Sequence, residues 1–385
     1  MNDRKLGIGM IGYGFMGRAH SMCFNRMAEV FYPMAAVPQL VTMAATTESK
    51  VCESAKRHGY LGWTTDWRDM LADERIDIID NTAPTFAHAE PSIAALKAGK
   101  HIIVEKPFAL TLQEGRAMAA AAEEAAEKGV QNIVAFNYRF VPALRLARKL
   151  ILDGTIGELY QYRSVYVGDR HTDLSSPYTW RMDVNKAGGG ALTDINSHAV
   201  DMMGFLTGME TKSVMSWMDT FIPERADVDG NMQQVTIDEV SLIMAKWGNG
   251  KVATLEASRV ATGYKNTLRI EIHGSEGGII FDLSRGNELQ FFSKKDPLSV
   301  QGFRAISVTE PAVHDFCKYW WPRGHNMGWE HNHLHMLHHF MNCIATGESV
   351  GPWGATFTDG LKCQEILEAA KLSNQRGQWV DIRTL

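Results

Sequence analysis

Two patterns of hydrophobic and polar positions divide the chain. Up to about residue 140, short apolar runs alternate with stretches in which apolar residues recur every three or four positions. This alternation is typical of a parallel sheet whose strands are joined by crossover helices. It predicts strands at 6–11, 40–45, 76–81, 101–105 and 132–137, and helices at 49–58 and 117–127.

After residue 140 the pattern changes to strands joined by short turns. A helix is expected at 142–152, and the tripeptide 248–250, Gly-Asn-Gly, favours a hairpin. The fold class is therefore α/β: a doubly wound parallel sheet over 1–140, then an α+β domain with a large, mostly antiparallel open sheet over 141–385. Its strands are expected at 159–167, 212–220, 240–247, 251–259, 267–273, 278–282 and 288–292, and later helices at 330–345 and 358–375.

A glycine motif follows the first predicted strand. Gly12-Tyr13-Gly14-Phe15-Met16-Gly17 has the form GxGxxG and opens a helix, where glycines permit a tight turn and close approach to a pyrophosphate. This context predicts a dinucleotide-binding Rossmann domain, with Gly12, Gly14, Phe15, Met16 and Gly17 as cofactor-binding residues. A glycine-rich turn without a ligand is the alternative.

The residues after the second strand bear on the choice of cofactor. An acidic residue at that strand end usually holds the adenosine ribose of NAD. Here Ala45 takes the expected position, Thr46 follows, and Glu48 is displaced along the chain. No arginine for a 2′-phosphate stands there, so NAD is favoured and NADP stays open.

A lysine ends another strand of the predicted parallel sheet. Glu105-Lys106-Pro107 closes the run 101–105, and ligands of open α/β sheets bind at the carboxyl ends of strands. A lysine buried beside a cofactor can relay protons, and Pro107 is a candidate for a cis peptide bond. A surface lysine at a strand end is the alternative.

Three consecutive glycines precede a second candidate site. Gly188–Gly190 suggests a loop that approaches another group closely before a helix begins. Asp194 and His198 are four residues apart, which places both on one face of that helix. A carboxylate beside an imidazole orients a general base near neutral pH, although an ordinary surface ion pair has the same spacing.

Composition excludes several classes of function. The chain has 385 residues, enough for two domains, with 45% hydrophobic and 22% charged residues and a net charge of −5. This balance indicates neither a nucleic-acid nor a membrane partner. Five scattered cysteines without CxxC spacing, and no signal-peptide or membrane-spanning pattern, predict a cytoplasmic protein.

Several motifs in this order resemble the Gfo/Idh/MocA family of nicotinamide-dependent sugar and cyclitol oxidoreductases. They are GYGFMGRAH, TAPTFAHAEPSIAALKAGKHIIVEKP, FNYRFVPALRLA, WRMDVNKAGGGALTDINSHAVDM and DGLKCQEILEAAKLSNQRGQWVDI. The resemblance runs nearly end to end and implies that Lys106, Asp194 and His198 are catalytic. Asn196 departs from the family pattern, which has glycine there. The aromatic, proline-rich stretch 31–38 resembles the members that oxidise anhydrosugars or disaccharides.

The resemblance implies oxidation of a secondary hydroxyl of a sugar, a pyranose, anhydrosugar or glycoside, to a keto sugar, with carbon 3 favoured. His198 would be the base, oriented by Asp194, while Lys106 polarises the oxygen. Further cofactor-binding candidates are Thr46, Thr82, Pro84, His88, Glu105, Lys106, Asn137, Trp180 and Arg181. Substrate-binding candidates are Lys106, Tyr138, Arg139, Asn196, His198, His325 and His331.

A run of histidines raises the question of a metal. His331, His335 and His339 have the i, i+4 spacing that can chelate zinc on a helix, but HExxH is absent and no carboxylate follows on that face. We expect no metal. His325 and His331 are assigned to the sugar pocket, and the other histidines of the run to solvated or packed positions.

Three alternatives remain open. The chain could be an inositol dehydrogenase, a glycosidase or lyase that retains its NAD and oxidises a carbon transiently, or a catalytically silent sugar sensor. The presence of Lys106, Asp194 and His198 together argues against the sensor. An antiparallel sheet with one free face further predicts a homodimer or homotetramer.

Overall fold

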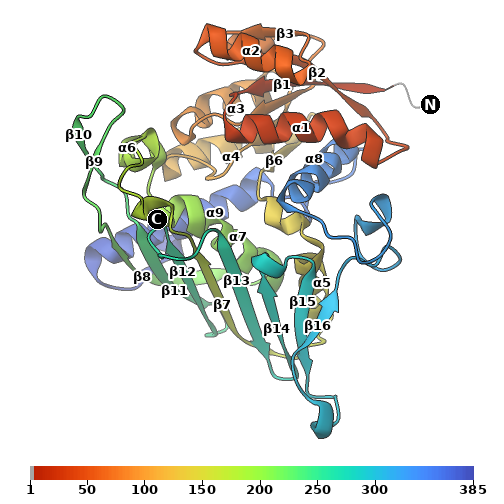
Figure 1. The fold of residues 1–385 in the computed structure, drawn as a ribbon, viewed down its shortest axis with the longest axis vertical. Coiled ribbons are helices and arrows are strands. Elements are labelled where there is room, and N and C mark those ends of the chain that lie inside the picture. The colour runs from red at the N-terminus through yellow and green to blue at the C-terminus, as the bar shows by residue number, and fades with distance from the viewer. Residues whose placement is uncertain (1–3) are drawn as a thin grey trace. The chain divides into compact units, whose positions relative to one another are not determined.

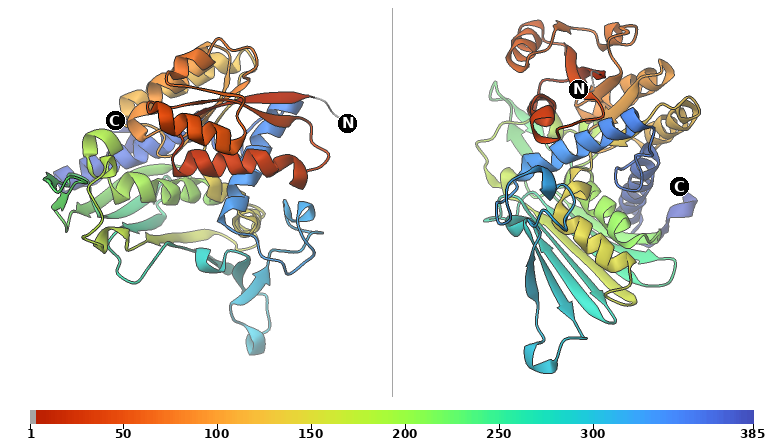
Figure 2. Two further views of the ribbon diagram at one scale, coloured as in Figure 1. Left: turned by 45° about the horizontal axis from the view of Figure 1, so that its top comes forward. Right: turned by 90° about the vertical axis from the view of Figure 1, so that its right-hand side faces the viewer.

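The computed structural model describes residues 4–385. The chain forms two compact units, one holding the chain up to Phe140 together with Gly328–Leu361, the other holding Val141–Met327 with Lys362–Leu385. Residues 328–361, which the sequence pattern places with the second domain, thus cluster with the first, because helix α8 (Trp329–Thr346) packs against helix α1 (Phe15–Val30). Figures 1 and 2 show these two helices side by side.

The sheet of the first unit is parallel throughout the described residues. Its strand order is β3-β2-β1-β4-β5-β6, the order of a doubly wound dinucleotide-binding sheet. The predicted α/β architecture is confirmed. The strands are β1 (Lys5–Ile11), β2 (Val37–Ala44), β3 (Gly62–Thr64), β4 (Ile78–Asn81), β5 (His101–Val104) and β6 (Asn132–Val134).

The register of this sheet aligns the strand ends that carry the sequence motifs. Ile11 at the end of β1 pairs with Asn81 at the end of β4, and Asn81 pairs with Val104 at the end of β5. The residues that follow each strand therefore stand along one carboxyl edge. Gly12, Thr82 and Glu105 are those residues, so the edge unites three of the sequence-predicted segments.

The helices of the first unit begin and end at recognisable signals. Thr111 caps α4 through a capping box with Glu114, which moves the helix start ahead of the predicted residue 117 and is worth about 1 kcal/mol. Gly59, with φ 80°, ends α2 in the left-handed conformation. The three helices that follow α1 in the first unit are α2 (Glu48–His58), α3 (Ala89–Lys97) and α4 (Leu112–Ala126).

The second unit is built on a mixed but mostly antiparallel sheet. Its order over the described residues is β16-β15-β14-β13-β7-β12-β11-β8-β17, and β7 with β12 is the parallel pair. Figure 1 shows these strands fanned out. They are β7 (Leu159–Val167), β8 (Thr211–Asp219), β11 (Val240–Trp247), β12 (Val252–Ser258), β13 (Thr267–Gly274), β14 (Gly277–Asp282), β15 (Glu288–Ser293), β16 (Arg304–Ser307) and β17 (Val380–Asp381).

One face of this sheet is covered and the other is open. Along β11 buried and exposed positions alternate: Ile243 and Ala245 are buried, whereas Leu242 and Met244 are exposed. Helices α5 (Pro142–Leu152) and α7 (Asn196–Thr207) pack on the buried face, as Figure 2 shows. The remaining helices are α6 (Val184–Ala187) and α9 (Phe357–Arg376), and β9 (Glu224–Ala226) with β10 (Met232–Gln234) forms a separate hairpin.

Several elements differ from the sequence expectation. The strand expected at 132–137 ends at Val134 and gives way to a 3₁₀ turn, Asn137–Phe140, and the short strands β3, β9, β10, β16 and β17 were not predicted. The hairpin at 248–250 is confirmed, with φ 81° at Gly250. Among the described residues, none of the helices combines the length and the hydropathy needed to cross a membrane.

Candidate active site

The glycine loop after β1 has the geometry of a pyrophosphate cradle. Gly12 has φ 100°, a conformation that favours glycine, and a Cβ on Gly17 would lie 2.2 Å from the Gly12 carbonyl oxygen. A Cβ on Gly14 would meet nothing within 4 Å, and no side chain caps the start of α1 at Phe15. The loop is therefore tight where the protein folds back on itself and open where α1 presents its first N–H groups, as bound pyrophosphate requires.

The tip of β2 carries neither an acid nor an arginine. The strand ends at Ala44, the backbone N–H of Ala45 donates to the carbonyl of Thr64, and Thr46 and Thr47 lead into α2. Glu48 lies in the first turn of that helix. The displaced acid that the sequence indicates is thus a residue of α2, one turn away from the strand end.

The loop after β4 is braced by a buried histidine. The hydroxyl of Thr82 donates to the Ile11 carbonyl at 2.8 Å, and Pro84 precedes a 3₁₀ turn. His88 is 1% exposed, and its two ring nitrogens lie 2.9 Å from the carbonyl oxygens of Ala83 and Pro107. Burial lowers the pKa of His88. This ring ties the loop after β4 to the turn at Lys106, and a cofactor contact of His88 stays a prediction.

Lys106 follows β5 at the carboxyl edge. Its backbone N–H donates to the Glu105 carboxylate at 3.0 Å, and the peptide bond to Pro107 is cis, as the sequence analysis suggested. Its side chain is half-buried. Asn137, just beyond β6, is 3% exposed, and its side-chain nitrogen has no hydrogen-bond partner, which suits a group that binds a ligand amide or hydroxyl.

The glycines at 188–190 approach their own unit of the protein. A Cβ on Gly190 would lie 1.7 Å from the Asp238 carbonyl oxygen, and one on Gly189 would lie 2.8 Å from the Thr193 methyl group. The Asp238 carboxylate accepts the N–H groups of Gly190 and Leu192 at 2.7 and 2.6 Å. The group that the loop approaches closely is thus part of the second unit itself: Gly190 admits the backbone just before β11, and Gly189 admits the Thr193 side chain.

Asp194 and His198 do not share one regular α-helix. Asp194 lies in a π-helical turn, Ala191–Ile195, and His198 in the first turns of α7. Single π turns inside helices are frequent at functional sites. His198 is 7% exposed, and its ring centroid is 5.9 Å from that of Tyr166.

An arginine holds Asp194. Arg259, the residue after β12, is 5% exposed and places a guanidinium nitrogen 2.7 Å from the Asp194 carboxylate, whose side chain is 37% exposed. Charge-assisted hydrogen bonds of this length fix the orientation of a carboxylate. Arg259 thus holds the Asp194 carboxylate in a fixed orientation, about one helical turn before the His198 imidazole.

Asn196 lies in the interior of the second unit. It is fully buried, and its side-chain nitrogen lies 3.2 and 3.1 Å from the carbonyl and hydroxyl oxygens of Ser241 on β11. The side-chain nitrogen thus ties α7 to the sheet, whereas the side-chain oxygen is buried without a hydrogen-bond partner, and a substrate contact of Asn196 stays a prediction. Arg139 is likewise buried, near Gly354 and Asp359 at 3.4 Å, and Tyr138 is 2% exposed.

The remaining candidate residues are Trp180, Arg181, His325 and His331, and each contacts residues of its own unit. Trp180 packs against Met182, Ala187, Val235 and Ile237, and the Arg181 guanidinium lies 4.5 Å from its ring centroid. His325 is exposed in the second unit, with a ring nitrogen 2.7 Å from the Pro322 carbonyl. In the first unit, His331 accepts the Gly328 N–H at the start of α8. Substrate contacts of both histidines stay predictions.

Most histidines of α8 are packed. His338 stacks on Phe31 with ring centroids 3.8 Å apart, and His335 and His339 lie 3.3 and 2.9 Å from the carbonyl oxygens of Phe140 and Val350. Among the described residues, one group has ligand atoms close enough to suggest a metal: His20, Glu105 and His333, all within 4.8 Å of one another. It differs from the i, i+4 pairs that the sequence analysis considered.

Comparison with known proteins decides the family. The model of the oxidoreductase family with an NAD-binding Rossmann fold matches residues 6–135, and that of the GFO/IDH/MocA C-terminal domain matches 144–280. This chain belongs to the GFO/IDH/MocA family. It is an NAD-dependent oxidoreductase by that membership, and the glycine cradle fits the cofactor.

Relatives of this GFO/IDH/MocA chain cover nearly its whole length. Levoglucosan dehydrogenase of Pseudarthrobacter phenanthrenivorans is 38% identical over 98% of each chain, and inositol 2-dehydrogenase of Rhizobium meliloti is 29% identical over 94% of each. The solved complex of levoglucosan dehydrogenase with NADH and levoglucosan has a TM-score of 0.93 at 38% identity, covering 98% of this chain and 100% of that one.

Sequence reasoning about this GFO/IDH/MocA chain missed four supporting residues. Arg259 and Asp238 hold the segment of Asp194, and His20 and Asp80 lie buried behind Glu105. Each is a charged or titratable residue inside or beside an apolar strand or helix pattern, as His20 is in α1 and Asp80 in β4. A charged or titratable residue in an apolar pattern could have been noticed in the sequence, but the pattern does not show which residue it contacts.

Proposed function

We propose that this chain oxidises a secondary hydroxyl of a pyranose, anhydrosugar or glycoside to the keto sugar, with carbon 3 the first position to test. The substrate loses a hydride from carbon to NAD and a proton from oxygen, so that a keto sugar, NADH and a proton leave. Similarity to levoglucosan dehydrogenase over 98% of each chain supports this substrate class.

We assign the proton transfer to Lys106, Asp194 and His198. His198 takes the hydroxyl proton, because a neutral imidazole is a base suited to neutral pH. Asp194, itself fixed by Arg259 at 2.7 Å, orients that imidazole. Lys106 polarises the hydroxyl oxygen as a cation. When bound, NAD supplies the hydride acceptor, and the protein supplies position and proton transfer.

One observation carries the assignment to the first unit. Lys106 stands directly after β5, whose register puts Gly12, Thr82 and Glu105 along the same edge of an NAD-binding sheet. Ligands of open parallel sheets bind at this edge. This position supports a role for Lys106 beside the cofactor.

The activity test is reduction of NAD and NADP with a panel of sugars. Levoglucosan, glucose, disaccharides and inositols are offered to the purified protein, and reduced nicotinamide is followed by absorbance. We expect turnover with NAD and with at least one pyranose or anhydrosugar. Turnover with inositols alone, or with none of the panel, contradicts the proposed substrate class.

Two variants test the assigned roles. Lys106→Met and His198→Asn are expected to lower kcat by about 10²–10⁴-fold, the usual share of general acid–base catalysis. Lys97→Met, an exposed lysine in the last turn of α3, is the matched control and should keep wild-type kcat. Wild-type turnover in either test variant contradicts its role.

Two other functions are separated by the same assay. A glycosidase or lyase that retains NAD would cleave glycosides without net NADH, whereas the proposed reaction accumulates NADH. A sugar sensor would bind sugar without any turnover. Release of NADH in proportion to keto sugar distinguishes the proposed function from both.

We further propose a homodimer or homotetramer, formed through the open sheet face, and a cytoplasmic location. Four large apolar side chains support the assembly: Trp217, Leu242, Met244 and Val252 are 41–49% exposed on adjacent strands. A second copy would cover them. Five cysteines in the thiol form suit a reducing compartment.

A further inference from the structure

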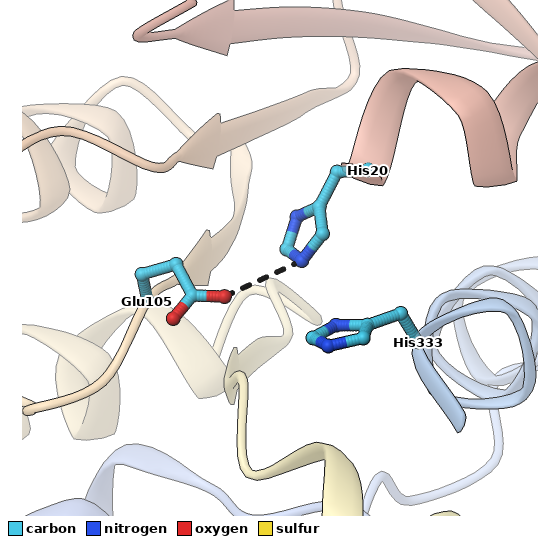
Figure 3. A group of neighbouring side chains, drawn as sticks. All are labelled: His20, Glu105 and His333. Atoms are coloured by element: carbon cyan, nitrogen blue, oxygen red, sulfur yellow. Dashed lines mark ion pairs between the residues drawn. The ribbon is translucent and has the colours of Figure 1, made fainter. Parts of the chain in front are cut away.

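A fully buried trio of charged groups lies behind Lys106. His20 comes from α1, Asp80 from β4 and Glu105 from the end of β5, and they are 0%, 0% and 4% exposed. The His20 Nδ1 lies 2.9 Å from the Asp80 carboxylate, and its Nε2 lies 3.4 Å from the Glu105 carboxylate. Figure 3 shows the His20 ring directed at Glu105, with His333 beside them.

With both carboxylates ionised, the placement of the imidazole requires a cation. A neutral imidazole has one N–H, so with a carboxylate at each nitrogen it would leave one carboxylate facing a lone pair. The protonated ring donates to Asp80 at 2.9 Å and forms an ion pair with Glu105 at 3.4 Å. Burial alone would lower the pKa of His20, but Asp80 and Glu105 outweigh that effect and raise it to about 10.

Further titratable residues near His20 and Asp80 are His333, Cys23 and Tyr60. The His333 ring of α8 lies 5.4 Å from that of His20, centroid to centroid. Cys23 and Tyr60 are affected by the Asp80 charge, and burial raises the pKa of Cys23 to about 12 and that of Tyr60 further, so both stay neutral. His20 is therefore the cation that faces the two buried carboxylates from α1.

Glu105 connects this trio to Lys106. One carboxylate oxygen faces His20, and the other accepts the Lys106 backbone N–H at 3.0 Å. The Glu105 backbone is in turn held by its own N–H, which donates to the Asn81 carbonyl at 3.0 Å. The Glu105 side chain thus spans from the cofactor helix α1 to the residue that carries the candidate catalytic amine.

We propose that His20 is a positioning residue for Lys106, acting through Glu105: the buried cation fixes the Glu105 carboxylate, and the carboxylate fixes the backbone of Lys106. This inference rests on the proposed function, because it assumes that the Lys106 amine must stand at a defined place. Displacement of a catalytic group by about 1 Å costs on the order of 10²-fold in rate, so a brace of this kind has a measurable effect.

Glu105→Gln is the first test. Glutamine keeps a carbonyl oxygen for the Lys106 N–H but offers His20 no charge, and it leaves one carboxylate, Asp80, opposite one cation. The fold should therefore persist, with a melting temperature no lower than that of the wild type. We expect kcat to fall by about 10- to 100-fold, while KM for sugar and for NAD stays within about 2-fold.

A double-mutant cycle identifies His20 as the source of the effect. His20→Gln should lower kcat as Glu105→Gln does, and the double variant should be no worse than either single one, because both remove the same brace. Ser21→Ala removes a neighbouring buried hydroxyl of α1, bonded to the Gly17 carbonyl, and should keep wild-type kcat. Effects of His20 and Glu105 that multiply, or an unchanged kcat in Glu105→Gln, overturn the proposal.

Two measurements do not depend on turnover. In the wild type, ¹⁵N shifts of the His20 ring should be those of an imidazolium at pH 8, and in both variants the Lys106 backbone amide should shift. If those hold while no sugar is oxidised, the proposed function fails and the brace stands. A neutral His20, or stoichiometric zinc found by elemental analysis at His20, Glu105 and His333, overturns the brace itself.

Discussion

At the scale of single residues, polar groups whose partners are distant in sequence hold the segment that carries Asp194. Arg259 holds Asp194 and Asp238 holds Gly190 and Leu192, across 65 and 46 to 48 positions. Asn196, which the sequence analysis assigned to the substrate, donates its side-chain N–H groups to Ser241. The residue types that do chemistry also hold folds together, and geometry separates the two uses.

Because the pKa of His338 is lowered on folding, we expect the free energy of unfolding to fall at acidic pH. Burial against Phe31 lowers the pKa of His338 from 6.5 to about 4. Between these two pH values His338 is therefore protonated in the unfolded chain and neutral in the folded chain. Its neutral form therefore supports stability above about pH 6.5, and that support is lost as the pH falls towards 4, by about 3 kcal/mol in all.

His338→Phe should retain the stack on Phe31 and flatten this dependence. Denaturant unfolding at pH 7, 5.5 and 4 measures it, and the exposed His325→Gln serves as the matched control with a wild-type profile. An equal loss of stability in His338→Phe and wild type between pH 6.5 and 4 would remove His338 as the source.

At the scale of elements, the glycine loop approaches the backbone before β11 closely just where the π turn begins. A Cβ on Gly190 would enter the Asp238 carbonyl, which is backbone and cannot move aside, whereas a Cβ on Gly204 in α7 would meet nothing. Gly190→Ala should therefore destabilise the protein by at least about 2 kcal/mol, and Gly204→Ala should stabilise it by about 0.5–1 kcal/mol.

Chemical denaturation of both variants provides the measurement. Since the π turn carries Asp194, Gly190→Ala should also lose activity beyond its loss of stability when assayed well below its melting temperature. If Gly190→Ala is as stable as the wild type, the contact with Asp238 does not hold the turn.

The elements that sequence could predict are those with their own periodicity. Strand β11 alternates buried and exposed residues, and β7 and α5 have the predicted bounds because their patterns are long. Strands β3 and β17 have three and two residues, too few to show a period. The π turn was not predicted, because Asp238, which accepts the N–H groups of Gly190 and Leu192, lies in another segment of the sequence. The position of Lys106 just beyond a parallel strand could be predicted because the motif and the strand end coincide.

At the scale of the whole molecule, the open sheet face predicts assembly. Trp217 of β8 pairs directly with Leu242 of β11, and both side chains are exposed by 48% and 41%. In a monomer these apolar groups would face water. We expect light scattering to give a dimer or tetramer for the wild type.

A charged pair on that face should break the assembly. Trp217→Glu with Leu242→Lys is expected to give a folded monomer, because burying the ion pair in an apolar interface loses more hydration free energy than the attraction between the two charges returns. Leu298→Lys, on an 87% exposed loop position, is the control and should leave the assembly unchanged. A monomeric wild type, or an oligomeric double variant, argues against this face.

The central claim is that hydride passes from a sugar carbon to nicotinamide and leaves as NADH. Its most direct test uses the best sugar of the panel, carrying deuterium at the oxidised carbon, with mass spectrometry of the nicotinamide released. The account predicts one deuterium per NADH, one keto sugar per NADH, and a slower reaction than with the unlabelled sugar. Deuterium retained in the sugar product, with no labelled NADH in solution, would contradict it.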